Sequence, residues 1–558
     1  MTSRLSNAAV ADILERHGRL LEIAGESPFR TRAFTRAAES LRMFPNHVST
    51  IAAEGRLREI PGIGEGISAA IQQILINGSF DAHRELTSRL PESLVEITAL
   101  PGVGAKTALR LFSALGVDGL ASLEAALVSG QVRETKGLGT RAEASIRTGI
   151  EALQRRTGRM PLGTALPIAR AFMDAYGQIR QGDRVSLAGS ARRWDVSVDD
   201  LDFVVASLDI PASIQGISSL PMVSEAERPA ENALRLHLSS GISADVYLTH
   251  PDAWGSALVR ATGNDRHLEQ LGALPELAAT EDEVYANRNL PFIPPELRVG
   301  REEFERCAEI PFLVEVGHIN GEFHAHTTWS DGAASIRQMA AAAVSRGYSV
   351  LGITDHSHGL GVAGGLDVER LRSQRREIGE ADGTEDIKLL AGAEVEVHRD
   401  GSLDFDDETL ANLDVVVASL HTGLRQQPRE ELTARLERVL TNPNVDIVAH
   451  PSGRLIERRE GGDFDWERVF ATAATTGTAL EINADPARLD LDPELARRAS
   501  QAGCLFTINC DAHHPSGFAL MEYGVAMARR AWLTPDGILN CWPQSRILEW
   551  LAGRGRPS

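Results

Sequence analysis

Apolar and polar positions follow three different spacings along the chain. Residues 1–155 have the pattern of short amphipathic helices separated by glycine turns. Residues 160–250 change to an alternation of apolar and polar positions, which is typical of strands. After residue 315, short apolar runs alternate with helical segments. This last pattern predicts a mostly parallel sheet or barrel that carries its functional side chains at the carboxyl ends of the strands.

One motif repeats in the first region: an apolar residue, a Gly-x-Gly turn and then an amphipathic helix. It occurs as IPGIGEGISAAI at 60–71, as LPGVGAKTALRL at 100–111 and, more loosely, as TKGLGTRAEASI at 135–146. Backbone N–H groups at such a turn, with the following helix N-terminus, can hold one phosphate. A single copy fits an ordinary helical turn, but three copies favour contact with a nucleic-acid backbone without sequence readout. The candidate DNA-binding residues are Gly62, Gly64, Gly102, Gly104, Lys106, Gly137 and Gly139.

Composition and charge narrow the class of protein. The 558 residues are 43% hydrophobic and 24% charged, as in soluble globular proteins, and suffice for several domains. The net charge of −20 is uneven, because residues 1–160 carry +3 and the remainder carries −23. The acidic part is either a solvated surface or a set of carboxylates that hold divalent metals. Without a long apolar run, a signal-peptide stretch or a cysteine framework, the sequence predicts a cytoplasmic protein with no membrane partner. We also expect a monomer.

A group of carboxylates marks the second region. Asp200 and Asp202 are two positions apart on a predicted strand, so both side chains project from the same face. Asp245 follows on a later strand and can complete the cluster. Gly189 and Ser190 precede these carboxylates at a turn that suits a triphosphate. A lone Asp-x-Asp is usually solvated, but this combination is typical of a site where two Mg²⁺ or Mn²⁺ ions hold an attacking oxygen and a pyrophosphate leaving group.

The third region places histidines and carboxylates after successive predicted strands. A lone histidine in a core is usually structural, but a whole series at strand ends predicts convergence on one barrel mouth. Such nitrogen and oxygen donors would hold two or three ions, with Zn²⁺, Mn²⁺ and Fe as candidates. Asp355 also lies at a strand end. The candidate metal ligands are His324, His326, Asp331, His356, Glu394, His421, His450, Asp511 and His513.

These motifs resemble those of known families. The glycine repeats resemble helix-hairpin-helix motifs, and the Gly-Ser turn with its Asp-x-Asp resembles the palm of family X DNA polymerases, within the nucleotidyltransferase superfamily. The resemblance implies that Asp200, Asp202 and Asp245 are catalytic. It also implies deoxynucleoside triphosphates as substrates, held by Gly189, Ser190, Arg193, Thr262 and Gly263.

The histidine-rich region resembles a PHP domain, which implies a distorted (βα)7 barrel with a metal centre that hydrolyses phosphate esters. Hairpins, palm and PHP domain together resemble the bacterial PolX family along nearly the whole chain. The fold class implied is multidomain α+β and α/β. We expect an N-terminal helical domain at 1–90, further hairpins at 91–158, a palm with a reduced thumb at 159–300 and a PHP domain at 315–558.

The expected function is DNA repair, in which a DNA polymerase fills gaps and a metal-dependent 3′-5′ exonuclease trims ends of DNA. We expect a weak polymerase, because Arg260 and Ala261 stand where the family commonly has two aromatic residues. Ala70 stands where some relatives have a Schiff-base lysine, so lyase activity by that route is not expected. The alternatives are a PHP nuclease or phosphoesterase, or a DNA-binding scaffold, with an inactive palm.

Overall fold

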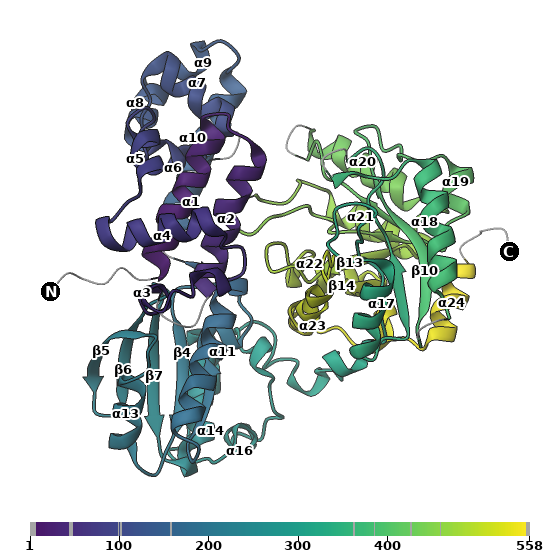
Figure 1. Cartoon of the computed structure of the whole chain (residues 1–558). Helices are drawn as coiled ribbons and strands as arrows, with labels where there is room; N and C mark the ends of the chain where they lie inside the picture. Colours follow the sequence, from purple (N-terminus) through teal and green to yellow (C-terminus); the bar gives the residue numbers. More distant parts are fainter. Residues whose placement is uncertain are drawn as a thin grey trace. The chain divides into compact units, whose positions relative to one another are not determined.

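The computed structural model divides the chain into two compact units, residues 1–292 and 293–558, and each is described by itself (Figure 1). The residues that the structure describes are 7–43, 48–98, 100, 103–156, 159–360, 363–383, 386–424, 427–457 and 459–553.

The first unit begins with a region made only of helices. Two apolar cores hold it together, one that includes Leu14 and Ile71 and one that includes Leu111 and Leu123. The glycine turns predicted from the sequence precede α4, α7 and α10. The helices are α1 (Asn7–Ile23), α2 (Pro28–Met43), α3 (Val48–Ala53), η1 (Leu57–Glu59), α4 (Glu65–Asn77), α5 (Asp81–Thr87), α6 (Leu94–Thr98), α7 (Ala105–Leu115), α8 (Leu120–Val128), α9 (Gln131–Glu134) and α10 (Thr140–Arg156).

The rest of the first unit, here called the palm region, is built on a five-stranded mixed sheet in the order β2-β4-β7-β6-β5. Phe203 on β4 stacks on Phe172 of α11, whereas Val204 packs with α14, so helices cover both faces of the sheet. Its elements are β1 (Met160–Pro161), α11 (Leu162–Ile179), β2 (Arg184–Ala188), α12 (Gly189–Arg192), β3 (Ser197–Val198), β4 (Leu201–Ala206), α13 (Ile210–Ser218), β5 (Val223–Ala230), β6 (Ala233–Leu238), β7 (Ser243–Thr249), η2 (Pro251–Ala253), α14 (Trp254–Thr262), α15 (Asp265–Leu271) and α16 (Glu281–Ala286).

The second unit holds seven parallel strands in the order β14-β13-β12-β11-β10-β9-β8. A bridge between Ala325 and Ala512, just beyond β8 and β14, nearly closes the sheet into a barrel. The strands are β8 (Gly321–Glu322), β9 (Val350–Ile353), β10 (Lys388–Glu396), β11 (Val415–Ser419), β12 (Ile447–Val448), β13 (Ala479–Asn483) and β14 (Phe506–Asn509).

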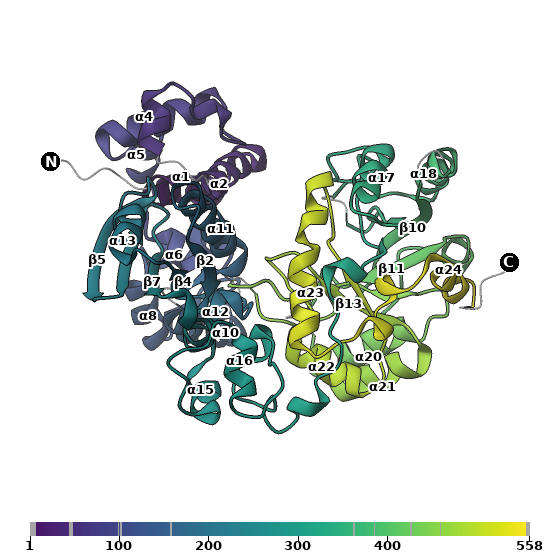
Figure 2. The same cartoon turned by 90° about the horizontal axis from the view of Figure 1, so that it is seen from below.

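Helices lie outside these strands, as expected where crossover helices join parallel strands (Figure 1, Figure 2). They are η3 (Pro295–Leu297), η4 (Cys307–Glu309), η5 (Val316–His318), α17 (Ile336–Ser345), α18 (Val368–Ala381), α19 (Asp407–Ala411), α20 (Arg429–Leu440), α21 (Trp466–Thr476), α22 (Pro493–Gln501), η7 (Pro515–Leu520), α23 (Met521–Arg530), η8 (Pro535–Gly537), η9 (Leu539–Cys541) and α24 (Gln544–Ala552).

The fold class predicted from the sequence is confirmed: a helical hairpin region, mixed α and β structure, and a distorted seven-stranded barrel. Among the described residues, no single helix is long and apolar enough to cross a membrane, although α7 and α8, bent by 67°, meet the criterion of length and composition together.

Candidate functional site

The carboxyl ends of the barrel strands bring all nine predicted metal ligands together. They fall into three groups, and within each group one ligand atom per residue lies within 4.8 Å of the others. The first group is His326, Asp331, His356 and His513; the second is His324, His326 and Asp511; the third is Glu394, His421 and His450.

Glu394, at the end of β10, is shared by several rings. Its Oε2 lies 2.6 Å from His356 Nδ1 and 3.4 Å from His324 Nε2, and its Oε1 lies 3.2 Å from His450 Nε2. On the other side of the cluster, Asp511 Oδ1 lies 3.1 Å from His326 Nε2. The buried carboxylates therefore stand between imidazoles, and both kinds of side chain would hold metal ions.

The donor set fits divalent ions. Several buried ligand atoms have no hydrogen-bond partner within the described ranges, among them His324 Nε2, both ring nitrogens of His326, and Asp511 Oδ1. Buried polar atoms without partners are costly, and a metal ion would satisfy them. Imidazole nitrogen with carboxylate oxygen suits Zn²⁺, Mn²⁺ or Fe, so the residues are compatible with the ions expected from the sequence.

Electrostatics keeps the carboxylates ionised. Burial alone would raise the pKa of Glu394, but the rings of His356 and His324 lower it well below the usual range. The same holds for Asp511. Burial alone would raise its pKa, but the neighbouring rings of His324 and His326 lower it well below the usual range. In contrast, burial and the nearby His356 lower the pKa of His326. Ionised carboxylates and a neutral imidazole are the forms that bind metals.

A second layer of residues orients these ligands, and sequence reasoning missed it. Glu481 on β13 lies with Oε1 2.8 Å from His324 Nδ1, and its Oε2 accepts a hydrogen bond from the backbone N–H of His450. The side-chain amide of Asn509 donates to the same carboxylate at 3.0 Å. Glu396 similarly lies 2.7 Å from His421 Nδ1. A carboxylate inside an otherwise apolar strand, as in ALEINA, is the signal that could have indicated Glu481.

Two further acidic residues, Asp355 and Glu322, accept hydrogen bonds from the backbone near the site. Asp355 is at a strand end, yet its carboxylate accepts hydrogen bonds from the backbone and hydroxyl of Thr327 at 2.8 and 2.7 Å. It therefore shapes the loop that carries Asp331. Glu322 on β8 accepts hydrogen bonds from the backbone N–H groups of His324 and Cys510, while burial raises its pKa to about 8.

The palm region gathers the three predicted carboxylates. Asp202 on β4 is the direct partner of Asp245 on the parallel strand β7, and Asp200 comes just before β4. Gly189, which has a φ of +62°, faces Asp202, and a Cβ at that position would overlap the carboxylate. Only glycine therefore allows the Gly-Ser turn to lie against the carboxylate cluster.

Burial and the closeness of like charges both raise the pKa of a carboxylic acid in this cluster. Burial raises the pKa of Asp202 to about 7, with further contributions from Asp200 and Asp245. Arg235 on β6 lies 3.6 Å from a carboxylate oxygen of Asp200 and 3.6 Å from one of Asp245. A cation relieves the repulsion between the carboxylates, so the three acids fit divalent metal ions as well.

The predicted nucleotide-binding residues form one framework. Arg193 donates to the carbonyl oxygen of Thr262 and to Asp195, both at 2.8 Å. Arg192 donates to both oxygens of Glu281 and to the Thr262 hydroxyl, and Thr262 is fully buried. Gly263 follows as the C-cap of α14, and the carbonyl of Ser190 accepts a hydrogen bond from the backbone of Asp195. The turns at 189–190 and 262–263 are therefore joined through arginine contacts.

The hairpin glycines differ in their roles. Gly62 and Gly137 have φ values of +80° and +85°, which L-residues with a side chain rarely adopt. Gly64 and Gly104 are the N-caps of α4 and α7 without a side-chain cap, and open space lies where a Cβ would be.

The remaining candidates in the hairpins include Gly139, which precedes α10 and has open space around its Cβ position. Lys106 is exposed in the first turn of α7. Gly102 lies outside the described residues. The accessible helix N-termini after Gly64 and Gly104 are suitable for phosphate contacts.

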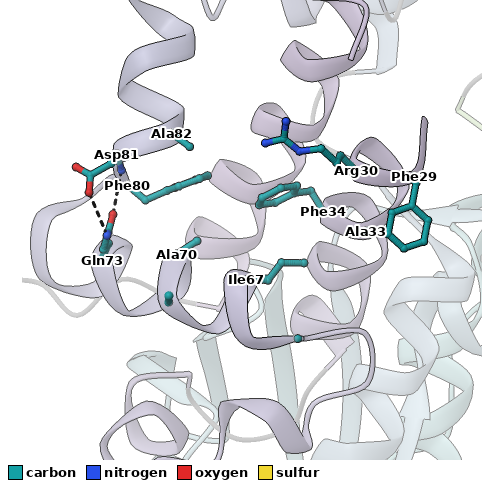
Figure 3. Close-up of a pocket in the computed structure, with 13 residues that line it drawn as sticks. Phe29, Arg30, Ala33, Phe34, Ile67, Ala70, Gln73, Phe80, Asp81 and Ala82 are labelled. Carbon is teal, nitrogen blue, oxygen red and sulfur yellow. Dashed lines mark hydrogen bonds between the residues drawn. The ribbon is translucent and has the colours of Figure 1, made fainter. Parts of the chain in front are cut away.

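A cavity of about 470 Å³ lies beside the first hairpin, between α2 and α4 (Figure 3). Phe34, Ile67 and Phe80 form apolar parts of its wall, and Arg30 also lines it. Ala70 is in this wall at the position where some relatives of family X would have lysine, so this residue offers no amine for a Schiff base.

Comparison with known proteins covers both units. Residues 6–80 match the family described as helix-hairpin-helix domain, and residues 322–485 match the PHP domain family. The chain is 35% identical over 552 residues to a protein of Bacillus subtilis (strain 168) named DNA polymerase/3′-5′ exonuclease PolX, which covers 95% of this chain and 96% of that protein.

The barrel alone is similar to smaller proteins. A probable phosphatase of Thermoanaerobacter sp. (strain X514) is 27% identical over 245 residues, which cover 42% of this chain and 94% of that protein. A probable phosphatase of Shewanella loihica (strain ATCC BAA-1088 / PV-4) is 28% identical over 254 residues, 44% of this chain and 95% of that protein.

Proposed function

This chain belongs to the PolX family of DNA polymerase/3′-5′ exonucleases, and from that premise we propose that its palm region and its barrel each carry one of the two activities. The resemblance expected from the sequence is thereby confirmed. The protein is a DNA-directed DNA polymerase and a 3′-5′ exonuclease that binds DNA and depends on metal ions.

We assign the exonuclease to the barrel, and the single observation that carries this assignment is the convergence of nine histidine and carboxylate ligands on one mouth. Two or three divalent ions there, from Zn²⁺, Mn²⁺ and Fe, would supply the positive charge that a phosphodiester needs for attack by water. Glu394 and Asp511, ionised and buried, hold the centre of the cluster. Glu481 holds the ring of His324 so that its Nε2 faces the other ligands.

We assign DNA synthesis to Asp200, Asp202 and Asp245. Mg²⁺ or Mn²⁺ ions held there would stabilise charge on the triphosphate of an incoming deoxynucleotide. Asp245 would orient the primer 3′-hydroxyl. The Gly189–Ser190 turn lies close enough to Asp202 to bring the triphosphate against the same ions. We assign further nucleotide contacts to Arg193, Thr262 and Gly263, since Arg193 donates to the carbonyl oxygen of Thr262.

We assign sequence-independent DNA contacts to the hairpins within residues 1–155. The uncapped N-termini at Gly64 and Gly104, and the exposed Lys106, support this assignment. The corresponding division of the chain is a helical domain at 1–90, further hairpins at 91–158, the palm at 159–300 and the PHP domain at 315–558. Gap filling with end trimming in DNA repair is the context in which one chain would need all four.

A phosphatase that acts on small phosphomonoesters is a second candidate, favoured by the similarity of the barrel to probable phosphatases. That role needs neither hairpins nor palm carboxylates, whereas the PolX similarity extends over 95% of the chain. A labelled primer annealed to a template, incubated with and without deoxynucleotides, tests the proposal. We expect extension with nucleotides and shortening without them; release of phosphate from small monoesters with neither change to the primer would contradict it.

A further inference from the structure

Arg488 is a positively charged residue beside the candidate ligands of the barrel. Neither the sequence patterns nor the family resemblance assigns Arg488 a role. It lies in the loop that follows β13, and its Nε is 3.9 Å from Asp511 Oδ2. Only 17% of its side chain is exposed. Its Nη1 is shielded from solvent and has no hydrogen-bond partner within the described parts of the chain. A buried guanidinium donor without a hydrogen bond is costly.

The backbone around Arg488 holds it in place. Its carbonyl oxygen accepts a hydrogen bond from Arg454 Nε at 2.8 Å, and its N–H donates to the carbonyl of Asp485 at 2.7 Å. The backbone N–H of Ile456 donates to the carbonyl of Ala487, also at 2.7 Å. These contacts connect the loop after β13 to the loop after β12. The position of the guanidinium is therefore a feature of the folded loop.

The contact with Asp511 does not account for Arg488. A distance of 3.9 Å is too long for a hydrogen bond, and the facing oxygen, Asp511 Oδ2, accepts a hydrogen bond from the side-chain amide of Asn483 at 3.3 Å instead. A cation at this point would also repel the divalent ions that the nine ligands fit. Both difficulties disappear if an anion lies between the guanidinium and the ions during the reaction.

We propose that Arg488 binds the scissile phosphodiester of the DNA 3′ end, donating hydrogen bonds to its non-bridging oxygens. The planar guanidinium matches two oxygens of a phosphate, and such charge-assisted bonds are among the strongest that side chains make. The proposal rests on the assignment of the exonuclease to the barrel and adds a substrate-binding residue to it. Arg488 neutralises the diester and fixes its orientation over the ligand cluster.

The test uses the full-length, metal-loaded protein as wild type, Arg488→Gln, Arg488→Lys and Arg497→Gln. Arg497, on α22, is a matched control, because its side chain is 18% exposed and it pairs with Glu302 at 2.6 Å. Hydrolysis of the p-nitrophenyl ester of thymidine 5′-monophosphate gives kcat and KM, and inorganic phosphate gives an inhibition constant. Bound metal is measured for every variant by elemental analysis.

We expect Arg488→Gln to raise KM and the inhibition constant of phosphate about ten- to a hundredfold while the metal content stays at the wild-type value. Arg488→Lys keeps the charge but not the planar fork, so its KM and inhibition constant should lie between those of the wild type and Arg488→Gln. Arg497→Gln should match the wild type in both. Unchanged phosphate inhibition in Arg488→Gln would overturn the proposal. Loss of metal from both Arg488 variants would also overturn it, because the residue would then support Asp511 only.

Failure of the proposed function would look different. A wild type that hydrolyses neither the ester nor a DNA 3′ end would contradict the assignment of the exonuclease to the barrel. Calorimetric titration of the metal-loaded wild type and Arg488→Gln with inorganic phosphate would still decide on Arg488. Equal affinity in the two proteins would reject it, and weaker affinity in Arg488→Gln would support it.

Discussion

Glu481 Oε1 lies 2.8 Å from His324 Nδ1, and both side chains are completely buried. This contact leaves His324 Nε2 for the centre of the barrel site, 3.4 Å from Glu394. A carboxylate behind a histidine ligand fixes the ring and raises its basicity. We therefore expect Glu481 to determine how His324 takes part in metal binding, although Glu481 does not itself belong to the three groups of candidate ligands.

Glu481→Gln keeps the shape of the side chain and removes its charge. We expect metal affinity to fall about ten- to a hundredfold, the effect usual for such partners of a metal ligand. Competition with a chelator, followed by elemental analysis of the bound metal, measures this directly. The same substitution at Glu467, an exposed residue on α21, is the control. Equal metal retention in Glu481→Gln and Glu467→Gln would show that the contact has no influence on the ligands.

Lys106→Ala is predicted to weaken DNA binding at the second hairpin. The side chain is exposed in the first turn of α7, beside the uncapped backbone of Gly104. Loss of one phosphate contact should reduce affinity for gapped DNA of any sequence and lower the slope of log affinity against log salt by about one. Fluorescence anisotropy over a salt series measures both, with the exposed Lys136→Ala as the third-hairpin comparison. Identical salt slopes for wild type and Lys106→Ala would contradict the assignment.

The helical region should lose stability in mild acid through His17. This residue is 1% exposed between Phe34 and Phe80, and neither of its ring nitrogens has a hydrogen-bond partner among the described residues. Burial above all, then His83 and Arg30, lowers the pKa of His17 to about 4.

In the unfolded chain the pKa of a histidine is about 6.5. Between about pH 6.5 and 4 the unfolded state therefore binds more protons than the folded state. Stability is therefore complete above that range and falls as the pH decreases, by about 3 kcal/mol in total. His17→Phe removes the titrating group, so calorimetry should show a variant that gains on the wild type as the pH falls from 7.5 to 5. A constant difference in unfolding temperature across this range would exclude His17 as the cause.

DNA synthesis should be slow in Mg²⁺ and faster in Mn²⁺. The carboxylates of the palm lie together, but Arg260 and Ala261 stand where the family resemblance implies two aromatic residues. Each lost positioning contact worth about 1.4 kcal/mol reduces the rate about tenfold. Primer extension with the two metals measures this in a His324→Ala, His326→Ala protein, where trimming cannot mask extension. A rate in Mg²⁺ equal to that in Mn²⁺, at low nucleotide concentration, would contradict a weakened nucleotide site.

Local patterns predicted more of the barrel site than of its surroundings. The nine candidate ligands could be recognised because each lies near the end of a strand or after it, and strand ends of a parallel barrel meet at one mouth. Asp355 has the same position in the pattern, but its carboxylate bonds to Thr327, a contact that no local spacing reveals. Glu481 and His324 are 157 positions apart, so their pairing depends on the register of the closed barrel.

In the palm, too, local patterns predicted some residues of the site and missed others. The alternation of polar and apolar positions placed Asp200 and Asp202 on one face, and the strand order β4-β7 brings Asp245 beside them. Arg235, which lies 3.6 Å from two of these carboxylates, comes from β6 and was not predicted. An exposed arginine on β6 has no distinctive sequence pattern. Its contact with the carboxylates becomes visible only when β6 and β7 are paired.

One experiment with gapped DNA tests whether the two activities belong to separate sites. A 5′-labelled primer is incubated with deoxynucleotides and without them, using the wild type, His324→Ala with His326→Ala, and Asp200→Ala with Asp202→Ala. We expect the barrel variant to extend the primer without shortening it and the palm variant to shorten it without extending it. Shortening by the barrel variant, or extension by the palm variant, would show that the two activities do not belong to these two sites.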